Sequence, residues 1–324
     1  DLSVSRGLIL KGGDNGILDV GKGKDIYSIN ADTDFIGFEI DVNNEPFLSI
    51  DYNYEAESDI LNIHDCKAHT TAENNKTALF SDRFTYLKAE RIMPAHYYKA
   101  NLSDVIQRNS IGYRGENAPL FIALKKFDPV RVAELQHNNA KANTLIANID
   151  AWMNDIVPGA RVVSTYYNEL DVVRLGYQFE YGAEVTPEFS PVNVGFGFTY
   201  ILPVITAVLA ARKGDLIIIE NPEAHLHPQG QARLGQLFAL AAAGGVQLII
   251  ESHSDHIFNG MRVAVKQKMI ATNDVSVFYF ERDETADEHI TTVSQPIIDS
   301  DGRISHKPNG FFDEYARLLD QILK

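Results

Sequence analysis

Aliphatic runs that end in polar residues mark buried strands in the second half of the sequence. Leu216 to Ile219 is one such run, and it suits a parallel strand that is covered on both faces of a sheet. Gln247 to Ile250 is a second run of this kind, and a further buried strand begins at Phe84. Residues 229–243 place apolar side chains at helical spacing and end at a Gly-Gly pair. The pattern predicts a β-α-β unit whose two parallel strands end at the same edge of one sheet.

The rest of the chain divides into alternating and helical patterns. Residues 8–54 alternate apolar and polar positions around glycine turns, which predicts antiparallel β structure, and residues 166–181 alternate as a hairpin. Residues 129–156 carry an apolar stripe at helical spacing, which we interpret as a compact helical lid or docking element. The apolar helix expected at residues 201–212 would place Pro203 in its first turn.

Polar groups directly follow the two strands of the β-α-β unit. Glu220, Asn221 and Glu223 come after the first strand, and Glu251 and His253 come at the end of the second. Ligands of open α/β sheets bind at the carboxyl ends of the strands, so these groups predict a site for Mg2+ and a nucleotide phosphate. We call this set the polar rim. Its other members are His225, His227, Asp255 and His256.

Three segments in the second half of the sequence together resemble the motifs of a known family. They are residues 193–203 (NVGFGFTYILP), residues 220–228 (ENPEAHLHP) and residues 251–256 (ESHSDH). In this order they resemble the signature, the Walker B strand end with its D-loop, and the switch-histidine strand end of ABC-type AAA ATPases. This branch of the P-loop NTPases includes the SMC, RecF and overcoming-lysogenisation-defect proteins.

Two later segments, residues 277–283 and 309–315, are similar to the closing strand and terminal helix of one bacterial family in that branch. Members of that family carry a C-terminal domain of unknown function after Walker B. The resemblance implies an α/β P-loop NTPase core with a mainly parallel sheet, a flanking antiparallel sheet and a small helical insertion. It further implies ATP and Mg2+ as cofactors, and a role in DNA repair or phage defence.

The resemblance assigns roles to four residues of the polar rim. Glu220 takes the Walker B position that supports Mg2+, and His253 resembles the switch histidine that contacts the γ-phosphate. Asn221 stands where most ABC ATPases have the glutamate that polarises the attacking water. An amide cannot accept a proton, so either hydrolysis is slow or Glu223 supplies the base.

The remaining implied roles concern a partner subunit. His227 falls in the D-loop that crosses to the partner, and Gly195 and Gly197 would let backbone N–H groups approach phosphates bound by the opposite protomer. A homodimer with composite nucleotide sites, coupled to a partner effector protein, is therefore expected. Arg91 could contact phosphate or the dimer partner, although a structural salt bridge is favoured, and Arg114 is ambiguous in the same way.

The sequence contains no G-x-x-x-x-G-K-[ST] phosphate loop. We expect that an N-terminal truncation removed this segment and that the chain alone binds ATP poorly. Four parts are predicted: a truncated ATPase lobe with antiparallel β structure (1–118), a helical insertion (119–160), the ATPase core (161–270) and a C-terminal strand and helix extension (271–324).

Composition limits the alternatives. A net charge of −15 argues against a general nucleic-acid binder, although DNA contact through a local patch or a partner stays open. The single cysteine fits a reducing cytoplasm, and neither a signal peptide nor a membrane span is evident. Two other functions stay open: a non-hydrolysing module that ATP closes into a dimer, and a metal-dependent hydrolase that uses the carboxylates and imidazoles of the rim.

Overall fold

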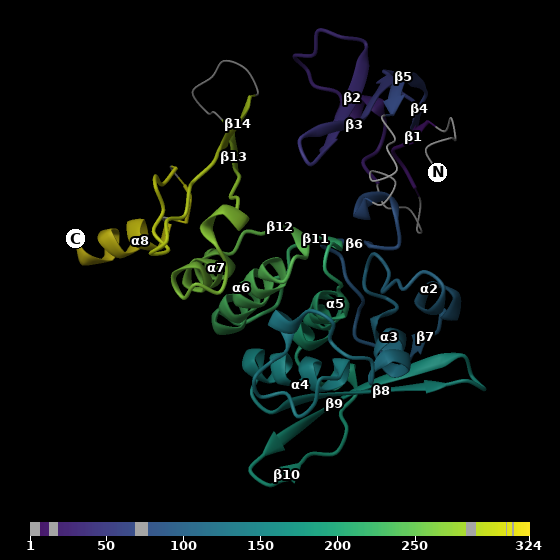
Figure 1. The fold of residues 1–324 in the computed structure, drawn as a ribbon, viewed down its shortest axis with the longest axis vertical. Coiled ribbons are helices and arrows are strands. Elements are labelled where there is room, and N and C mark those ends of the chain that lie inside the picture. Colours follow the sequence, from purple (N-terminus) through teal and green to yellow (C-terminus); the bar gives the residue numbers. More distant parts are fainter. Residues whose placement is uncertain (1–6, 13–18, 69–76, 283–289, 309, 313) are drawn as a thin grey trace. The chain divides into compact units, whose positions relative to one another are not determined.

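The computed structural model describes residues 7–12, 19–68, 77–282, 290–308, 310–312 and 314–324 (Figure 1). The chain divides into two compact units. The N-terminal unit comprises Asp1–Ser81 with Asp287–His289, and the main unit comprises Asp82–Ala286 with Ile290–Lys324. In the described part of the chain, no helix is long and apolar enough to cross a membrane.

The N-terminal unit contains a three-stranded antiparallel sheet in the order β2-β3-β5. β2 (Phe35–Val42) and β3 (Glu45–Asn53) form a hairpin whose turn residues, Asn43 and Asn44, have φ of 55° and 64°. Asn tolerates this left-handed conformation better than most residues, which suits a tight hairpin turn. The antiparallel prediction is confirmed for β2 and β3. The other elements are β1 (Leu8–Ile9), α1 (Gly23–Ile26), β4 (Ile60–Leu61), β5 (Ile63–Ala68) and η3 (Ala78–Phe80).

The main unit contains a three-stranded parallel sheet in the order β12-β11-β6. It is formed by β6 (Phe84–Leu87), β11 (Leu216–Glu220) and β12 (Gln247–Glu251). α6 (Pro228–Ala243) connects β11 to β12, so the predicted β-α-β unit is confirmed. The register pairs Glu220 with Glu251, and the two strands therefore end at the same level.

The prediction of full burial is right for β11 and wrong for β12. Ile217 and Ile219 of β11 are 2% and 0% exposed, whereas Ile249 of β12 is 50% exposed. Among the described residues, β12 pairs only with β11, so its other edge has no strand beside it. An aliphatic run in a sequence cannot distinguish a central strand from one at the end of a sheet.

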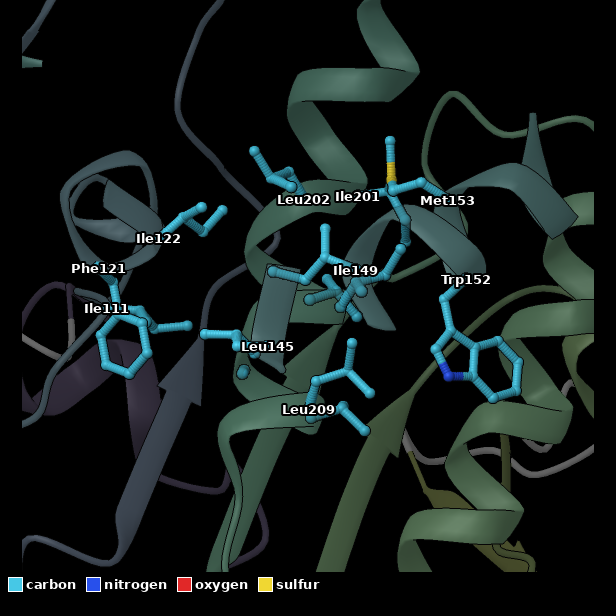
Figure 2. Close-up of a cluster of buried hydrophobic side chains, with 14 of the residues drawn as sticks. Ile111, Phe121, Ile122, Leu145, Ile149, Trp152, Met153, Ile201, Leu202 and Leu209 are labelled. Atoms are coloured by element: carbon cyan, nitrogen blue, oxygen red, sulfur yellow. The ribbon is translucent and has the colours of Figure 1, made fainter. Parts of the chain in front are cut away.

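The core of the main unit lies between helices and a second, antiparallel sheet. α3 (Ala118–Lys125), α4 (Leu145–Ile156) and α5 (Phe196–Ala210) contribute most of the side chains in Figure 2, among them Ile149 and Leu209. β8 (Ala160–Tyr167) and β9 (Val172–Tyr181) pair as an antiparallel hairpin. The predicted hairpin is confirmed, but its first strand begins six residues before the predicted start at residue 166. The smaller elements nearby are β7 (Tyr98–Lys99), α2 (Leu102–Ile106), η4 (Ala133–Leu135), β10 (Glu184–Val185) and η5 (Pro191–Asn193).

The helix predicted over residues 129–156 is much shorter in the structure. It begins at Leu145, after Thr144 caps it by accepting the N–H of Ala147 at 3.4 Å. Its apolar stripe is buried in the core, with Ile149 and Met153 both 0% exposed. The interpretation as a lid or docking element is therefore wrong, because the stripe packs against the rest of the main unit.

α5 also differs from its prediction. It begins at Phe196, five residues before the predicted start, so Pro203 lies inside the helix and not in its first turn. A proline there removes one helical N–H donor, and the prediction had therefore excluded it from the interior. Both Leu202 and Val204 beside it are 0% exposed, which shows how strongly packing holds this helix together.

The C-terminal part of the main unit follows α7 (Asp255–Lys266) and η6 (Thr272–Asp274). β13 (Tyr279–Arg282) pairs with β14 (Thr291–Ser294), and in the described residues it does not join the parallel sheet. α8 (Glu314–Leu323) ends the chain. Of the two segments predicted here, Asp283, Asn309 and Asp313 lie outside the described residues. The four-part division of the chain stays a prediction.

Candidate functional site

The carboxylate of Glu220 is held from the neighbouring strand. The hydroxyl of Tyr86 donates a hydrogen bond to Oε1 at 2.6 Å, and the backbone N–H of Ala89 donates to Oε2 at 2.9 Å. Tyr86 lies on β6, which runs parallel to β11, and Ala89 follows β6 directly. Hydrogen bonds to an ionised acceptor are short and strong, so these two donors fix the orientation of the carboxylate.

Tyr86 stays a hydrogen-bond donor to Glu220 at physiological pH. Burial raises the pKa of Tyr86 well above its ordinary value, and the hydrogen bond to Glu220 raises that pKa further. The phenol therefore stays protonated and continues to donate its hydrogen bond to Glu220.

The turn after β11 is tied to the end of β12. Asn221 has a left-handed φ of 42°, and its N–H donates to the backbone oxygen of Glu251 at 3.0 Å. A left-handed asparagine is tolerated in tight turns because its short polar side chain bonds locally. The turn thus places Glu223, two residues further on, beside the residues that follow β12.

Arg91 lies under this turn and is 0% exposed. Its Nη2 donates to the backbone oxygen of Glu220 at 2.6 Å, and its Nη1 donates to that of Asn221 at 3.4 Å. Burial lowers the pKa of Arg91 to about 10, so the side chain remains a cation at neutral pH. The favoured salt bridge is not found among the described residues, because the partners are main-chain oxygens. Arg91 is also too buried to meet a phosphate directly.

Glu223 and His253 are joined through the end of β12. The hydroxyl of Ser252 donates to Glu223 Oε2 at 2.8 Å, and the N–H of His253 donates to Oε1 at 2.7 Å. The imidazole of His253 is 85% exposed, and its Nε2 lies 3.2 Å from Oε1 of Glu251. The structure therefore gathers these groups with Glu220 and Asn221 at one edge of the sheet.

The three residues assigned to a partner interface lie on α5 and at the start of α6. His227 is exposed and caps α6, accepting the N–H of Gln229 on Nδ1 at 3.4 Å. A Cβ on Gly197 would lie 2.5 Å from the backbone oxygen of His225, whereas one on Gly195 would meet nothing closer than Phe198 at 3.7 Å. Gly197 is thus required by packing within this chain, whereas a side chain at Gly195 would make only ordinary contact with Phe198.

The histidine of that contact is itself packed on α5. The ring of His225 lies 4.7 Å from that of Phe196 and 4.9 Å from that of Tyr200, measured between centroids. Tyr200 also faces the guanidinium of Arg91 at 5.8 Å. No hydrogen bond in the described residues joins Gly195, Gly197 or His227 to the carboxylates of the polar rim. Arg114, the other ambiguous arginine, pairs on the surface with Glu90 at 2.6 Å.

Sequence reasoning missed Tyr86 and Ser252 as parts of the site. Ser252 lies inside the ESHSDH segment, and its position beside the switch histidine was a usable signal. Tyr86 carries no such signal, because it precedes Glu220 by 134 residues and meets it only through the pairing of β6 with β11.

The donor set suits Mg2+. Mg2+ takes oxygen ligands, keeps several waters and is held by one or two carboxylates plus substrate phosphates. Glu220 offers an oriented carboxylate, and no group of three or more His, Cys, Asp or Glu in the described residues could form a protein-only cage. The oriented carboxylate of Glu220 therefore fits Mg2+ chemistry at this edge of the sheet.

Comparison with protein families assigns the class. Residues 14–259 match the family described as "AAA domain, putative AbiEii toxin, Type IV TA system", a class of AAA ATPase domains. Residues 270–322 match the family described as "Protein of unknown function (DUF3696)". Because the first match spans most of the chain, the protein belongs to this AAA-domain family, and the predicted ABC-type α/β ATPase class is confirmed. No curated protein matches the sequence.

Three of the solved structures that are similar to this chain are described as SMC proteins. One, described for ATP-driven dimerization and DNA-stimulated activation, is 12% identical with a TM-score of 0.35, covering 56% of this chain and 91% of its own. An SMC head bound to the C-terminal winged-helix domain of ScpA is 10% identical with a TM-score of 0.41, covering 79% and 70%. A Pyrococcus furiosus SMC head bound to the C-terminal domain of ScpA is 14% identical with a TM-score of 0.31, covering 56% and 38%.

Proposed function

We propose that the polar rim binds and hydrolyses ATP with Mg2+. The observation that carries this proposal is the convergence of Glu220, Glu223 and His253 at the carboxyl ends of two adjacent parallel strands. Ligand sites of open α/β sheets lie at this edge, and the family of the chain is one of AAA domains.

Each residue of the rim has a distinct part in the proposed reaction. Glu220, whose orientation is set by Tyr86 and Ala89, would hold Mg2+. The ion, when bound, neutralises charge that develops on the phosphates. His253 extends its exposed imidazole toward the γ-phosphate and orients it. Water attacks the γ-phosphorus, the bond to the β-phosphate oxygen breaks and ADP leaves, while one water proton stays with the released phosphate and the other passes to solvent.

A dimer with shared nucleotide sites is the second part of the proposal. His227 is exposed at the start of α6, and Gly195 is exposed immediately before α5, so both can meet a second copy. A nucleotide that contacts both chains binds the closed state far better than the open one, and its binding would drive closure. Closure would act on a partner effector protein in the cytoplasm, in DNA repair or phage defence.

Turnover of two variants tests the proposal. Glu220→Gln keeps the shape of the side chain but removes the charge that supports Mg2+, and His253→Ala removes the group that meets the γ-phosphate. We expect each to lower ATP turnover of the native protein by about 10²-fold or more, as for other electrostatic groups of active sites. Phosphate release under saturating Mg2+ and ATP measures the effect. Glu169→Gln, at an exposed loop carboxylate, is the matched control and should turn over normally. Normal rates in both site variants would remove the assigned roles.

A non-hydrolysing module is the second candidate function. The amide of Asn221 cannot act as a base, and both oxygens of Glu223 already accept hydrogen bonds from the protein. In this case ATP would close a dimer without being consumed. Nucleotide-dependent dimerization with no phosphate release from the native protein would select this candidate. For the metal-dependent hydrolase, the described residues supply no three-ligand cluster as support.

A further inference from the structure

Glu223 is bound at both carboxylate oxygens by residues that follow β12. Ser252 donates its hydroxyl to Oε2 at 2.8 Å, and His253 donates its backbone N–H to Oε1 at 2.7 Å. These distances are typical of charge-assisted hydrogen bonds, which are about twice as strong as neutral ones. Glu223 thereby links the turn after β11 to the loop after β12.

The imidazole of His253 has little else to hold it in place. Its side chain is 85% exposed, and its Nε2 lies 3.2 Å from Oε1 of Glu251, whose own side chain is 50% exposed. An exposed ion pair of this kind contributes little and is screened by salt. The position of the imidazole therefore depends on the backbone of His253, and the hydrogen bond that its N–H donates to Glu223 Oε1 fixes that backbone.

A carboxylate that acts as a general base uses an oxygen lone pair aimed at the attacking water. The structure shows both oxygens of Glu223 aimed at donors of the protein, one a hydroxyl and one a backbone N–H. These two hydrogen bonds fix the carboxylate against the loop after β12. The arrangement suits a group that holds its neighbours in place.

We propose that Glu223 is a positioning residue for His253 and not the proton acceptor of the reaction. This inference rests on the proposed ATPase function of the polar rim. Glu223 acts through its hydrogen bond with the His253 N–H. This bond fixes the backbone of His253 and so orients its exposed imidazole. Loss of the link lets the loop after β12 shift, and the imidazole then misses the γ-phosphate.

A double-mutant cycle in turnover separates the two roles. Glu223→Gln keeps one acceptor oxygen but turns an amide N–H2 toward one of the two donors, and we expect it to lower kcat on the order of 10-fold through misplacement. In the His253→Ala background, the same substitution should change kcat by less than about twofold, because the imidazole it positions is already gone. A base acts independently of the imidazole. If Glu223→Gln lowers kcat by the same factor in the wild-type and the His253→Ala backgrounds, the proposal is wrong.

Amide hydrogen exchange of His253 tests the link without any nucleotide. The His253 N–H is protected by Glu223 in the wild-type protein, so Glu223→Gln should speed its exchange by about 10-fold or more. Glu251→Gln is the matched control, because it changes the side-chain partner of His253 and leaves the N–H bond intact. Unchanged exchange in the Glu223→Gln protein would overturn the proposal.

The turnover measurement and the hydrogen-exchange measurement test the two proposals independently. If the native protein releases no phosphate, the proposed ATPase function fails, while the exchange rate still decides whether Glu223 holds His253. Should Glu223→Gln not fold, Glu223→Asp takes its place, since it keeps the charge but its carboxylate is one methylene too short to reach both donors. The same expected and contrary outcomes then apply.

Discussion

Carboxylates in the main unit differ in the donors that surround them. Glu220 and Glu223 each accept two hydrogen bonds, from groups that lie far away in the sequence. Asp150 on α4 accepts a hydrogen bond from the N–H of Val162 at 2.8 Å. Burial raises the pKa of Asp150 from 3.8 to about 6, against the smaller opposing effect of that N–H. Ionising Asp150 therefore destabilises the folded state.

The pH dependence of stability should reveal Asp150. Its folded pKa lies above its unfolded value, so the folded state binds more protons and stability falls as pH rises from about 4 through about 6. Asp150→Asn keeps the acceptor for Val162 and cannot ionise. From about 2 pH units at 1.36 kcal/mol each, the variant should gain up to about 3 kcal/mol over wild type above pH 7 and almost nothing near pH 4.

Urea denaturation of both proteins at several pH values measures the gain in the free energy of unfolding. Glu169→Gln, at an exposed position, is the control and should follow wild type throughout. An Asp150→Asn protein whose advantage does not change with pH would show that Asp150 is solvated in the folded state.

Elements whose identity depends on near neighbours could be predicted from the sequence. The β11-α6-β12 unit and the β8-β9 hairpin follow from local periodicity, and the polar rim follows from the rule that ligands bind at strand ends. Features that depend on contacts with other elements could not be predicted from the sequence. The contact of Tyr86 with Glu220 depends on strand pairing across 134 residues. The burial of α4 and the exposed edge of β12 depend on which other elements lie beside them, and periodicity encodes none of this.

The crossing of α6 and α7 gives a test at the level of elements. A Cβ on Gly260 of α7 would lie 2.1 Å from the backbone oxygen of Ala232 on α6, so neither helix can give way without a backbone shift. We expect Gly260→Ala to lower the free energy of unfolding by about 1–3 kcal/mol through overpacking. Gly195→Ala is the matched control, because its added Cβ meets nothing closer than 3.7 Å.

Chemical denaturation of the two glycine variants measures the difference. α7 begins two residues after His253, so a shift of α7 should also lower ATP turnover in the Gly260→Ala protein. Equal stability of the two variants would mean that α6 and α7 are not in close backbone contact in solution.

At the scale of the whole molecule, net charge is the property that bears on assembly. Each chain carries a net charge of −15, so two copies repel one another and a nucleic acid is repelled as well. Salt weakens both repulsions, because the screening length falls to about 10 Å at 0.1 M ionic strength. Added salt should therefore strengthen the association of two acidic copies. By contrast, added salt strongly weakens DNA binding through basic groups, because such binding releases counterions. The response to salt therefore distinguishes a self-associating surface from a DNA-binding one.

The proposed dimer should respond to both nucleotide and salt. We expect the native protein with Mg2+ and a non-hydrolysable ATP analogue to shift from monomer to dimer, and the dimer to strengthen several-fold as salt rises from about 50 mM to about 300 mM. Light scattering coupled to gel filtration measures the mass. His227→Ala should weaken the nucleotide-dependent dimer, because this exposed side chain would meet the second copy, whereas His306→Ala, at another exposed histidine, should not. A dimer that forms equally without nucleotide, or that salt dissociates, would contradict closure by a shared nucleotide between two acidic surfaces.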